Sequence, residues 1–151
     1  MKLTTLCYIE KDGKMLFLHR NKKKNDVHKG KYIGLGGKLE PGESPDECVI
    51  REVREESGLE IKSPVLRGIM TFPLFDGDED WYAFLYSAHE FAGEISESDE
   101  GELHWVDKSD IERLDLWEGD RLFLDWMNRY DFFSAKFVYK DRQLEEYSVN
   151  I

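Results

Sequence analysis

The stretch that decides the fold runs from Gly37 to Leu59 and reads GKLEPGESPDECVIREVREESGL. Ser44 followed by Pro45 is typical of a helix start, because serine caps free backbone N–H groups and proline suits the first helical position. Gly58 suits the left-handed residue that follows the last turn of a helix. The sequence therefore predicts a helix that begins near Ser44 and Pro45 and ends at Gly58.

Three acidic residues of this predicted helix, Glu52, Glu55 and Glu56, are spaced i, i+3 and i+4. That spacing places their side chains on one face, where like charges destabilise an isolated helix by roughly 0.2–0.5 kcal/mol per pair. A fold keeps this arrangement most readily if a cation binds to it, and Mg²⁺ prefers carboxylate oxygens and usually arrives with phosphates. The alternative is an acidic helix face that is merely solvated.

The remainder of the chain alternates between predicted strands and helices. Apolar-rich runs predict strands at Thr4–Glu10, Lys14–Arg20, Val65–Phe75, Trp81–Phe91, Leu103–Val106, Phe132–Tyr139 and Leu144–Val149. The first two runs flank Lys11-Asp12-Gly13, which predicts a hairpin turn. Lys108–Leu114 and Glu118–Tyr130 are predicted helices, and Asn21–Lys31 is a predicted basic loop. Strands with interspersed helices indicate an α/β fold, and the length predicts a single domain over residues 1–151.

Composition and charge restrict the partners that this chain can have. The 151 residues carry a formal net charge of -11, with a sequence pI near 4.8. Such a surface repels nucleic-acid polymers, whereas a bound metal could still neutralise a small anionic substrate locally. Cys7 and Cys48 are too few for a disulfide framework. With no signal-peptide-like or membrane-spanning run, we expect a cytoplasmic monomer that has no membrane partner.

The acidic stretch also resembles the signature of a known family, the Nudix box G-x(5)-E-x(7)-R-E-U-x-E-E-x-G-U, in which U is a bulky aliphatic residue. All spacings are intact over residues 37–59: Gly37, Glu43, Arg51, Glu52, Val53, Glu55, Glu56, Gly58 and Leu59. Seven fixed identities would match by chance on the order of 10⁻⁸ times per start position. The resemblance implies a metal-dependent pyrophosphohydrolase with a mixed β-sheet sandwiched between α-helices, in which the box forms a loop–helix–loop.

The resemblance also implies how the metal is held. The Gly37 carbonyl, Glu52 and Glu56 would bind Mg²⁺, with Mn²⁺ as an alternative, and Glu55 would bind a further ion or polarise water. Arg51 would orient Glu55, and Glu43 would steady the loop rather than act in catalysis. Many family members bring one more carboxylate from a loop before a strand, and Glu100 fits that position. The alternative for Glu100 is a solvated acidic loop.

Likeness beyond the box points to a substrate. The runs GKYIGLGGKLEPGE, SDEGELHWV, LWEGD and FFSAKFVY resemble the oxidised-purine nucleoside triphosphatases, especially MutT-type 8-oxo-dGTP diphosphatases. Those enzymes release a nucleoside monophosphate and pyrophosphate, and so remove a mutagenic precursor from the nucleotide pool before DNA synthesis. The resemblance implies six substrate-binding residues: Lys23, Ile33, Gly36, Lys38, Trp117 and Asp120.

Several of these positions depart from the subgroup or have a simpler interpretation. Gly119 stands where a second aspartate reads the base, and Ile33 replaces an asparagine. Trp117 could pack in the core instead of stacking on a base, and Lys23 could belong to an exposed solubilising loop. The four histidines show no metal-ligand spacing in the sequence and are interpreted as structural or surface residues.

Two other functions remain open at this stage. The same chemistry could serve ADP-ribose, a dinucleoside polyphosphate or a nucleotide sugar. A non-catalytic nucleotide-sensing domain is the other alternative, although such domains usually lose acids of the box, and this chain has lost none.

Overall fold

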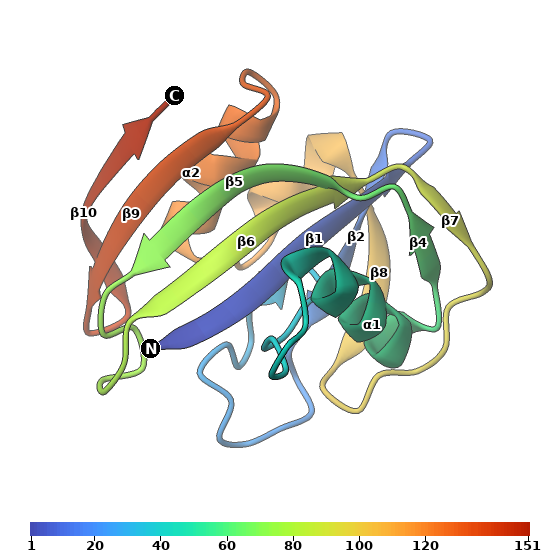
Figure 1. Ribbon diagram of the computed structural model, residues 1–151, viewed down its shortest axis with the longest axis horizontal. Coiled ribbons are helices and arrows are strands. Elements are labelled where there is room, and N and C mark those ends of the chain that lie inside the picture. Colours follow the sequence, from blue (N-terminus) through green and yellow to red (C-terminus); the bar gives the residue numbers. More distant parts are fainter.

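The computed structural model describes all 151 residues and shows a twisted mixed sheet with one helix on each side (Figure 1). The strands are β1 Lys2–Lys11, β2 Lys14–His19, β3 Tyr32–Ile33, β4 Glu60–Lys62, β5 Val65–Phe72, β6 Trp81–Ala88, β7 Glu90–Ala92, β8 Glu102–Asp107, β9 Phe133–Lys140 and β10 Gln143–Asn150. The helices are α1 Pro45–Ser57, the 3₁₀-helix η1 Lys108–Arg113 and α2 Glu118–Met127.

The main sheet has the strand order β10-β9-β5-β6-β1-β2-β3, and β8 pairs with β2 beside that path. The β1–β6 and β5–β9 pairs are parallel, and the other pairs are antiparallel. This arrangement confirms the expected α/β fold with a mixed sheet.

Two hydrophobic cores lie on opposite faces of the sheet, and β1 contributes to both. Cys7 and Ile9 pack with α1, whereas Tyr8 packs with α2. Successive side chains of a strand point to opposite faces, so a strand covered on both sides is apolar at consecutive positions. The central position of β1 therefore explains its continuous buried run and sets the distance between the two helices.

Helix α1 begins and ends where the sequence predicts. The Ser44 hydroxyl accepts from the Glu47 N–H, and the Glu47 carboxylate accepts from the Ser44 N–H, which completes a capping box. Gly58 follows the helix with φ 81°, and its N–H donates to the Arg54 carbonyl. The hairpin turn at Asp12 and Gly13 is confirmed as well, with φ of 52° and 75°.

The structure differs from the predicted elements in four places. The predicted strand over residues 65–75 ends at Phe72. The predicted strand over residues 81–91 divides into β6 and β7, because Glu90–Ala92 leaves the main sheet and pairs with the unpredicted strand β4. The predicted helix over residues 118–130 ends at Met127. The helix expected over residues 108–114 is a 3₁₀-helix. Two three-residue strands that pair only with each other leave too short a pattern to detect in the sequence.

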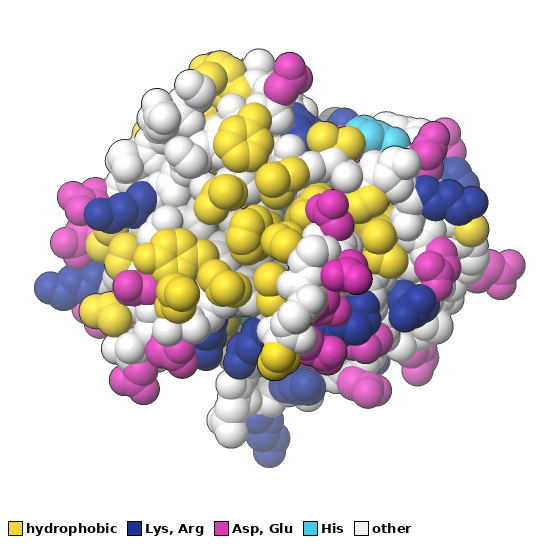
Figure 2. Space-filling view, viewed as in Figure 1, with side chains coloured by type: hydrophobic (Ala, Val, Ile, Leu, Met, Phe, Trp, Pro, Cys, Tyr) yellow, Lys and Arg dark blue, Asp and Glu magenta, His cyan; other side chains and the backbone are white.

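Helix α1 covers only part of its face of the sheet. In the space-filling view, hydrophobic side chains gather over β5 and β6 beside α1, and acidic side chains gather along α1 itself (Figure 2). Large apolar residues such as Leu3 and Val65 are 38% and 51% exposed. Neither long helix has the length and hydropathy needed to span a membrane.

Gly58 offers a test of how the end of α1 is held. A Cβ added there would lie 2.9 Å from the Ser96 hydroxyl and 3.0 Å from the Glu94 carbonyl. Gly42 has a similar φ of 80° but nothing within 4 Å of an added Cβ. Both Gly→Ala variants should lose about 1–2 kcal/mol of unfolding free energy from the left-handed backbone. We expect a further loss only in Gly58→Ala, measured by urea denaturation; equal losses would show that the contact to residues 94–96 is unimportant.

Candidate active site

The acidic face of α1 lies against the backbone of the loop that precedes it. The Glu56 carboxylate is 8% exposed and accepts from the Gly36 N–H at 2.8 Å. A Cβ added to Gly37 would lie 2.4 Å from the carboxyl carbon of Glu52. Only glycine permits this approach. The loop and the carboxylates therefore form one packed unit, as the predicted loop–helix–loop requires.

Burial and mutual repulsion raise the pKa values of these acids. Burial raises the pKa of Glu56 well above its ordinary value, and the neighbouring Glu100 carboxyl, which is close enough to hydrogen-bond with it, raises it further. Burial also raises the pKa of Glu52. Glu55 is the exposed member, with 57% of its side chain accessible. Crowded hard oxygen donors of this kind fit a divalent cation such as Mg²⁺, which would relieve their repulsion.

The structure brings Glu100 to this cluster although it lies far away in the sequence. Its carboxylate is 3.4 Å from Arg20 and 3.6 Å from Lys23, and it lines the same cavity as Glu52. A hydrogen bond of 3.2 Å from the Glu100 N–H to the Ser98 hydroxyl shapes its loop. The solvated-loop alternative therefore does not describe Glu100, and its metal-binding role stays our prediction.

The direction of the backbone favours Gly36 for the carbonyl ligand that was predicted at Gly37. The Gly37 carbonyl accepts from the Thr5 N–H at 2.9 Å, so it faces β1. In an extended chain the N–H and C=O of one residue point to the same side, and successive residues alternate. Because the Gly36 N–H donates to Glu56, the Gly36 carbonyl also faces the acids. The sequence pattern predicted a carbonyl ligand at Gly37, but it could not show which of the two neighbouring glycine carbonyls points toward the acids.

Arg51 holds the acidic residues in position. Its guanidinium donates to both oxygens of Glu43 at 2.7 and 2.9 Å, to Glu52 at 2.9 Å and to Glu55 at 3.2 Å. It also donates to the Lys38 carbonyl at 3.1 Å. The bidentate pair with Arg51 lowers the pKa of Glu43 to about 2. These contacts give Arg51 the geometry of the orienting residue that the sequence predicts, with Glu43 as its anchor.

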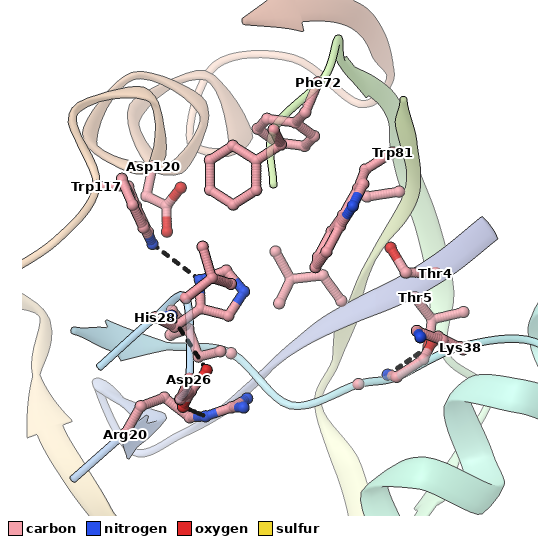
Figure 3. Close-up of a pocket in the computed structure, with 18 of the residues that line it drawn as sticks. Thr4, Thr5, Arg20, Asp26, His28, Lys38, Phe72, Trp81, Trp117 and Asp120 are labelled. Atoms are coloured by element: carbon pink, nitrogen blue, oxygen red, sulfur yellow. Dashed lines mark hydrogen bonds and ion pairs between the residues drawn. The ribbon is translucent and has the colours of Figure 1, made fainter. Parts of the chain in front are cut away.

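A cavity of about 410 Å³ is lined both by Glu52 and Glu100 and by aromatic side chains. Figure 3 shows Trp81 and Trp117 on opposite sides and Lys38 at the end nearer α1. Nine hydrophobic residues contribute to its lining. The volume lies within the usual range for small-molecule sites. Aromatic walls at one end and carboxylates at the other suit a ligand with a flat apolar part and a charged part.

Two polar groups of the aromatic end distinguish this pocket. Asp120, on α2, is 6% exposed, and burial raises its pKa to about 8, which favours the protonated carboxyl near neutral pH. The Tyr139 hydroxyl accepts from the Gly119 N–H at 2.7 Å, and burial raises the pKa of Tyr139 above its ordinary value. A Cβ at Gly119 would lie 2.7 Å from that hydroxyl, which explains why no aspartate fits there. Sequence reasoning missed Tyr139, because only its contact with Gly119 reveals it.

Trp117 is packed more tightly than a free stacking platform. It is 4% exposed, and its indole N–H donates to His28 Nδ1 at 2.9 Å. The Lys31 ammonium and the Arg142 guanidinium lie 5.2 and 4.8 Å from its ring centre. Burial lowers the pKa of His28 to about 4, so this imidazole is neutral. These contacts favour the packing alternative for Trp117, although it lines the cavity, and base stacking stays a prediction.

The other predicted substrate residues lie at the cavity or beside it. Ile33, Gly36 and Lys38 line the cavity, whereas Lys23 reaches it through the ion pair with Glu100. Arg20 also lines the cavity and was missed; its guanidinium is 2.6 Å from Asp26. A single arginine after a strand carries no sequence signal of its own, since its partners come from two loops.

Comparisons with known proteins agree with this geometry. A model of the NUDIX domain matches residues 2–127. "Uncharacterized Nudix hydrolase YvcI" of Bacillus subtilis is 39% identical over 131 residues, or 84% of this chain and 79% of that protein. "Oxidized purine nucleoside triphosphate hydrolase" of Danio rerio is 30% identical over 139 residues, which cover 92% of this chain and 87% of that protein. "ADP-ribose pyrophosphatase" of Methanocaldococcus jannaschii is 31% identical over 120 residues, which cover 79% of this chain and 69% of that protein.

Among solved structures, that of the "mMutator MutT protein from Bacillus halodurans" is similar over almost the whole chain. Its TM-score is 0.89 at 30% identity, and the match covers 99% of this chain and 98% of that chain. The likeness therefore includes the C-terminal hairpin β9–β10, which lies beyond the residues that the domain model matches.

Arg51 can be tested with a change that keeps its charge. Arg51→Lys removes the planar, multidentate contacts to the acids, so we expect kcat for pyrophosphate-bond hydrolysis to fall by about 10–100-fold, the usual cost of losing a group that orients metal ligands. Arg54→Lys is the matched control, since Arg54 is exposed and contacts only Glu60. Kinetics and thermal unfolding would be compared; wild-type kinetics in Arg51→Lys would remove the orienting role.

Proposed function

Because the chain belongs to the Nudix family of hydrolases that act on pyrophosphate bonds, we propose that it hydrolyses oxidised purine nucleoside triphosphates, such as 8-oxo-dGTP, to a nucleoside monophosphate and pyrophosphate. The observation that carries the proposal is that one cavity is lined both by Glu52 and Glu100 and by aromatic side chains. In the cell this reaction would cleanse the nucleotide pool.

The acidic end would hold Mg²⁺, or Mn²⁺ in its place. Glu52, Glu56 and Glu100 would supply carboxylate oxygens, and Gly36 would supply a carbonyl. The exposed Glu55, one oxygen of which accepts from Arg51, would hold a further ion or accept a proton from water. A bound divalent ion would neutralise charge on the phosphoryl oxygens and make the attacking water more acidic. Arg51 would hold the carboxylates of Glu52 and Glu55 in place through its hydrogen bonds to both.

The basic residues near the cavity support binding of a polyphosphate. Arg20 lines the cavity, and Lys23 lies 3.6 Å from Glu100 with over half of its side chain exposed. Lys38 lines the wall nearer α1. These three cationic side chains would attract phosphates at the cavity. Because the whole chain has a net charge of -11, the rest of the surface still repels a nucleic-acid polymer.

The aromatic end would read the base through Asp120 and Tyr139. 8-Oxoguanine carries an N7–H donor beside a C8 carbonyl, whereas guanine carries only the N7 acceptor. A neutral carboxyl offers one donor and one acceptor side by side, which complements the oxidised edge at two points and the normal edge at one. The Tyr139 hydroxyl, whose oxygen already accepts from Gly119, keeps its proton to donate.

A second function has specific support, because one relative is named an ADP-ribose pyrophosphatase. Pyrophosphate release from 8-oxo-dGTP and dGTP, and AMP release from ADP-ribose, would be compared with Mg²⁺ present. We expect the highest kcat/KM for 8-oxo-dGTP. A higher value for ADP-ribose would reject the oxidised-purine role and leave the family chemistry intact.

Glu56→Gln tests the metal-binding end. The change removes a ligand charge but keeps the shape, so we expect kcat to fall at least about 10²-fold, which is about 2.7 kcal/mol of barrier. Glu100→Ala should also lower kcat, whereas Glu97→Ala in the same loop should be nearly neutral, since Glu97 is exposed. EDTA should abolish activity and Mg²⁺ should restore it; a folded Glu56→Gln protein with most of its turnover would contradict the assignment.

Asp120 tests the base-reading end through pH. The preference for 8-oxo-dGTP over dGTP, as a ratio of kcat/KM values, should fall as pH rises through about 8, because the carboxyl ionises and loses its donor. Asp120→Asn keeps one donor and one acceptor, so its ratio should not change with pH. Asp120→Ala should give a ratio near one throughout. A wild-type ratio that is flat from pH 6.5 to 9.5 would place the base reader elsewhere.

Tyr139→Phe removes a single hydroxyl from the pocket. We expect a several-fold rise in KM for 8-oxo-dGTP with little change in kcat, since the group contacts the base and not the phosphates. Tyr147→Phe is the control, because Tyr147 is 52% exposed and outside the cavity. Matching kinetics of the two variants would make Tyr139 a packing residue.

A further inference from the structure

Two histidines and a glutamate that are far apart in the sequence meet on one face of β2 and β8. His19, the last residue of β2, is directly opposite Glu102, the first residue of β8, and Phe17 is opposite His104. Paired residues share a face, and so do residues two apart in one strand. His19, Glu102 and His104 therefore project together, although the sequence showed no ligand spacing among the histidines.

Their donor atoms lie close together and in part already face one another. One ligand atom from each residue lies within 4.8 Å of the others. The Asn21 amide nitrogen donates to a Glu102 oxygen at 2.7 Å and lies 3.4 Å from His19 Nδ1. A positively polarised group thus bridges the carboxylate and the imidazole, at a place where a cation could bind both.

Packing holds the His19 side chain in place, whereas the side chains of Glu102 and His104 can move. The His19 ring stacks on Tyr32 with ring centres 4.1 Å apart and planes 3° from parallel. Glu102 and His104 are exposed, so their side chains can contract around an ion, which needs ligand distances of about 2.0–2.2 Å. Exposure on this side also provides a route for the ion and a position for water.

We propose that His19, Glu102 and His104 form a binding site for a borderline transition-metal ion, with Zn²⁺ as the best fit. Two imidazoles and one carboxylate suit Zn²⁺, whereas Mg²⁺ prefers oxygen ligands alone. The site shares no ligand with the acids of α1. It joins the end of β2 to the start of β8, next to Arg20 and two residues from Glu100.

The local packing would transmit binding to that neighbourhood. A Cβ added to Gly101, between Glu100 and Glu102, would lie 1.8 Å from the His19 carbonyl, so the two strand ends are in close backbone contact. An ion that joins His19 to Glu102 would restrain the segment that carries Glu100. The site is therefore a structural clamp beside the catalytic loop and independent of which nucleotide is hydrolysed.

The test is a Zn²⁺ titration of the full chain with ¹⁵N-labelled histidine, followed by the imidazole resonances. Excess Mg²⁺ is present throughout to occupy the acids of α1. We expect one equivalent of Zn²⁺ to shift the resonances of His19 and His104, while those of His28 and His89 stay in place. Zn²⁺ affinity, measured by competition with a chromophoric chelator, should fall at least tenfold in His104→Ala and in Glu102→Gln.

His89→Ala is the matched control, since His89 is an exposed histidine that contacts Glu10 on another part of the surface. Its Zn²⁺ affinity should stay within twofold of wild type. The proposal is overturned if ten equivalents of Zn²⁺ leave the His19 and His104 resonances unchanged. It is also overturned if His104→Ala and Glu102→Gln, both folded by circular dichroism, bind Zn²⁺ as tightly as His89→Ala.

Discussion

The contact between the Gly36–Gly37 backbone and the carboxylates of α1 is the constraint on which the site depends. It places a peptide group 2.8 Å from a buried glutamate and leaves no room for a side chain at Gly37. Such packing concentrates carboxyl groups. Arg51 pairs with Glu52 and Glu55, and Arg20 and Lys23 pair with Glu100, whereas no cationic side chain pairs with the buried Glu56. The fold thus holds one buried glutamate without a cationic side chain beside it, at a place where a bound cation would be favoured.

The sheet connects this acidic end with the aromatic end. β1 is covered by α1 on one face and by α2 on the other, so the two helices are held at a fixed separation by a strand buried on both sides. The cavity uses residues from both sides of this arrangement, with Glu52 from α1 and Asp120 from α2. A ligand that spans the cavity would therefore contact residues of both helices.

Substitutions at the aromatic end are coupled to one another. Gly119 lacks a side chain because the Tyr139 hydroxyl occupies that space, and the same hydroxyl restores a polar group to the pocket. Burial raises the pKa of Asp120 to about 8, which favours a protonated carboxyl at the aromatic end near neutral pH. With the proposed substrate, the carboxylates of Glu52 and Glu100 would lie where a metal ion meets the phosphates.

The sequence by itself determined the elements whose signals are local: the capped helix α1, the Asp12-Gly13 hairpin, the spacing of Glu52, Glu55 and Glu56, and the family that this spacing identifies. The family resemblance also singled out Glu100, whose metal-binding role stays a prediction. Only the tertiary structure decided which carbonyl faces the acids, because one residue of shift in an extended chain reverses its direction. Only the tertiary structure brought Tyr139 to Gly119 and His19 to His104. Such contacts depend on how segments that are distant in the sequence pack and pair, and the local pattern of residues does not show which strands will pair.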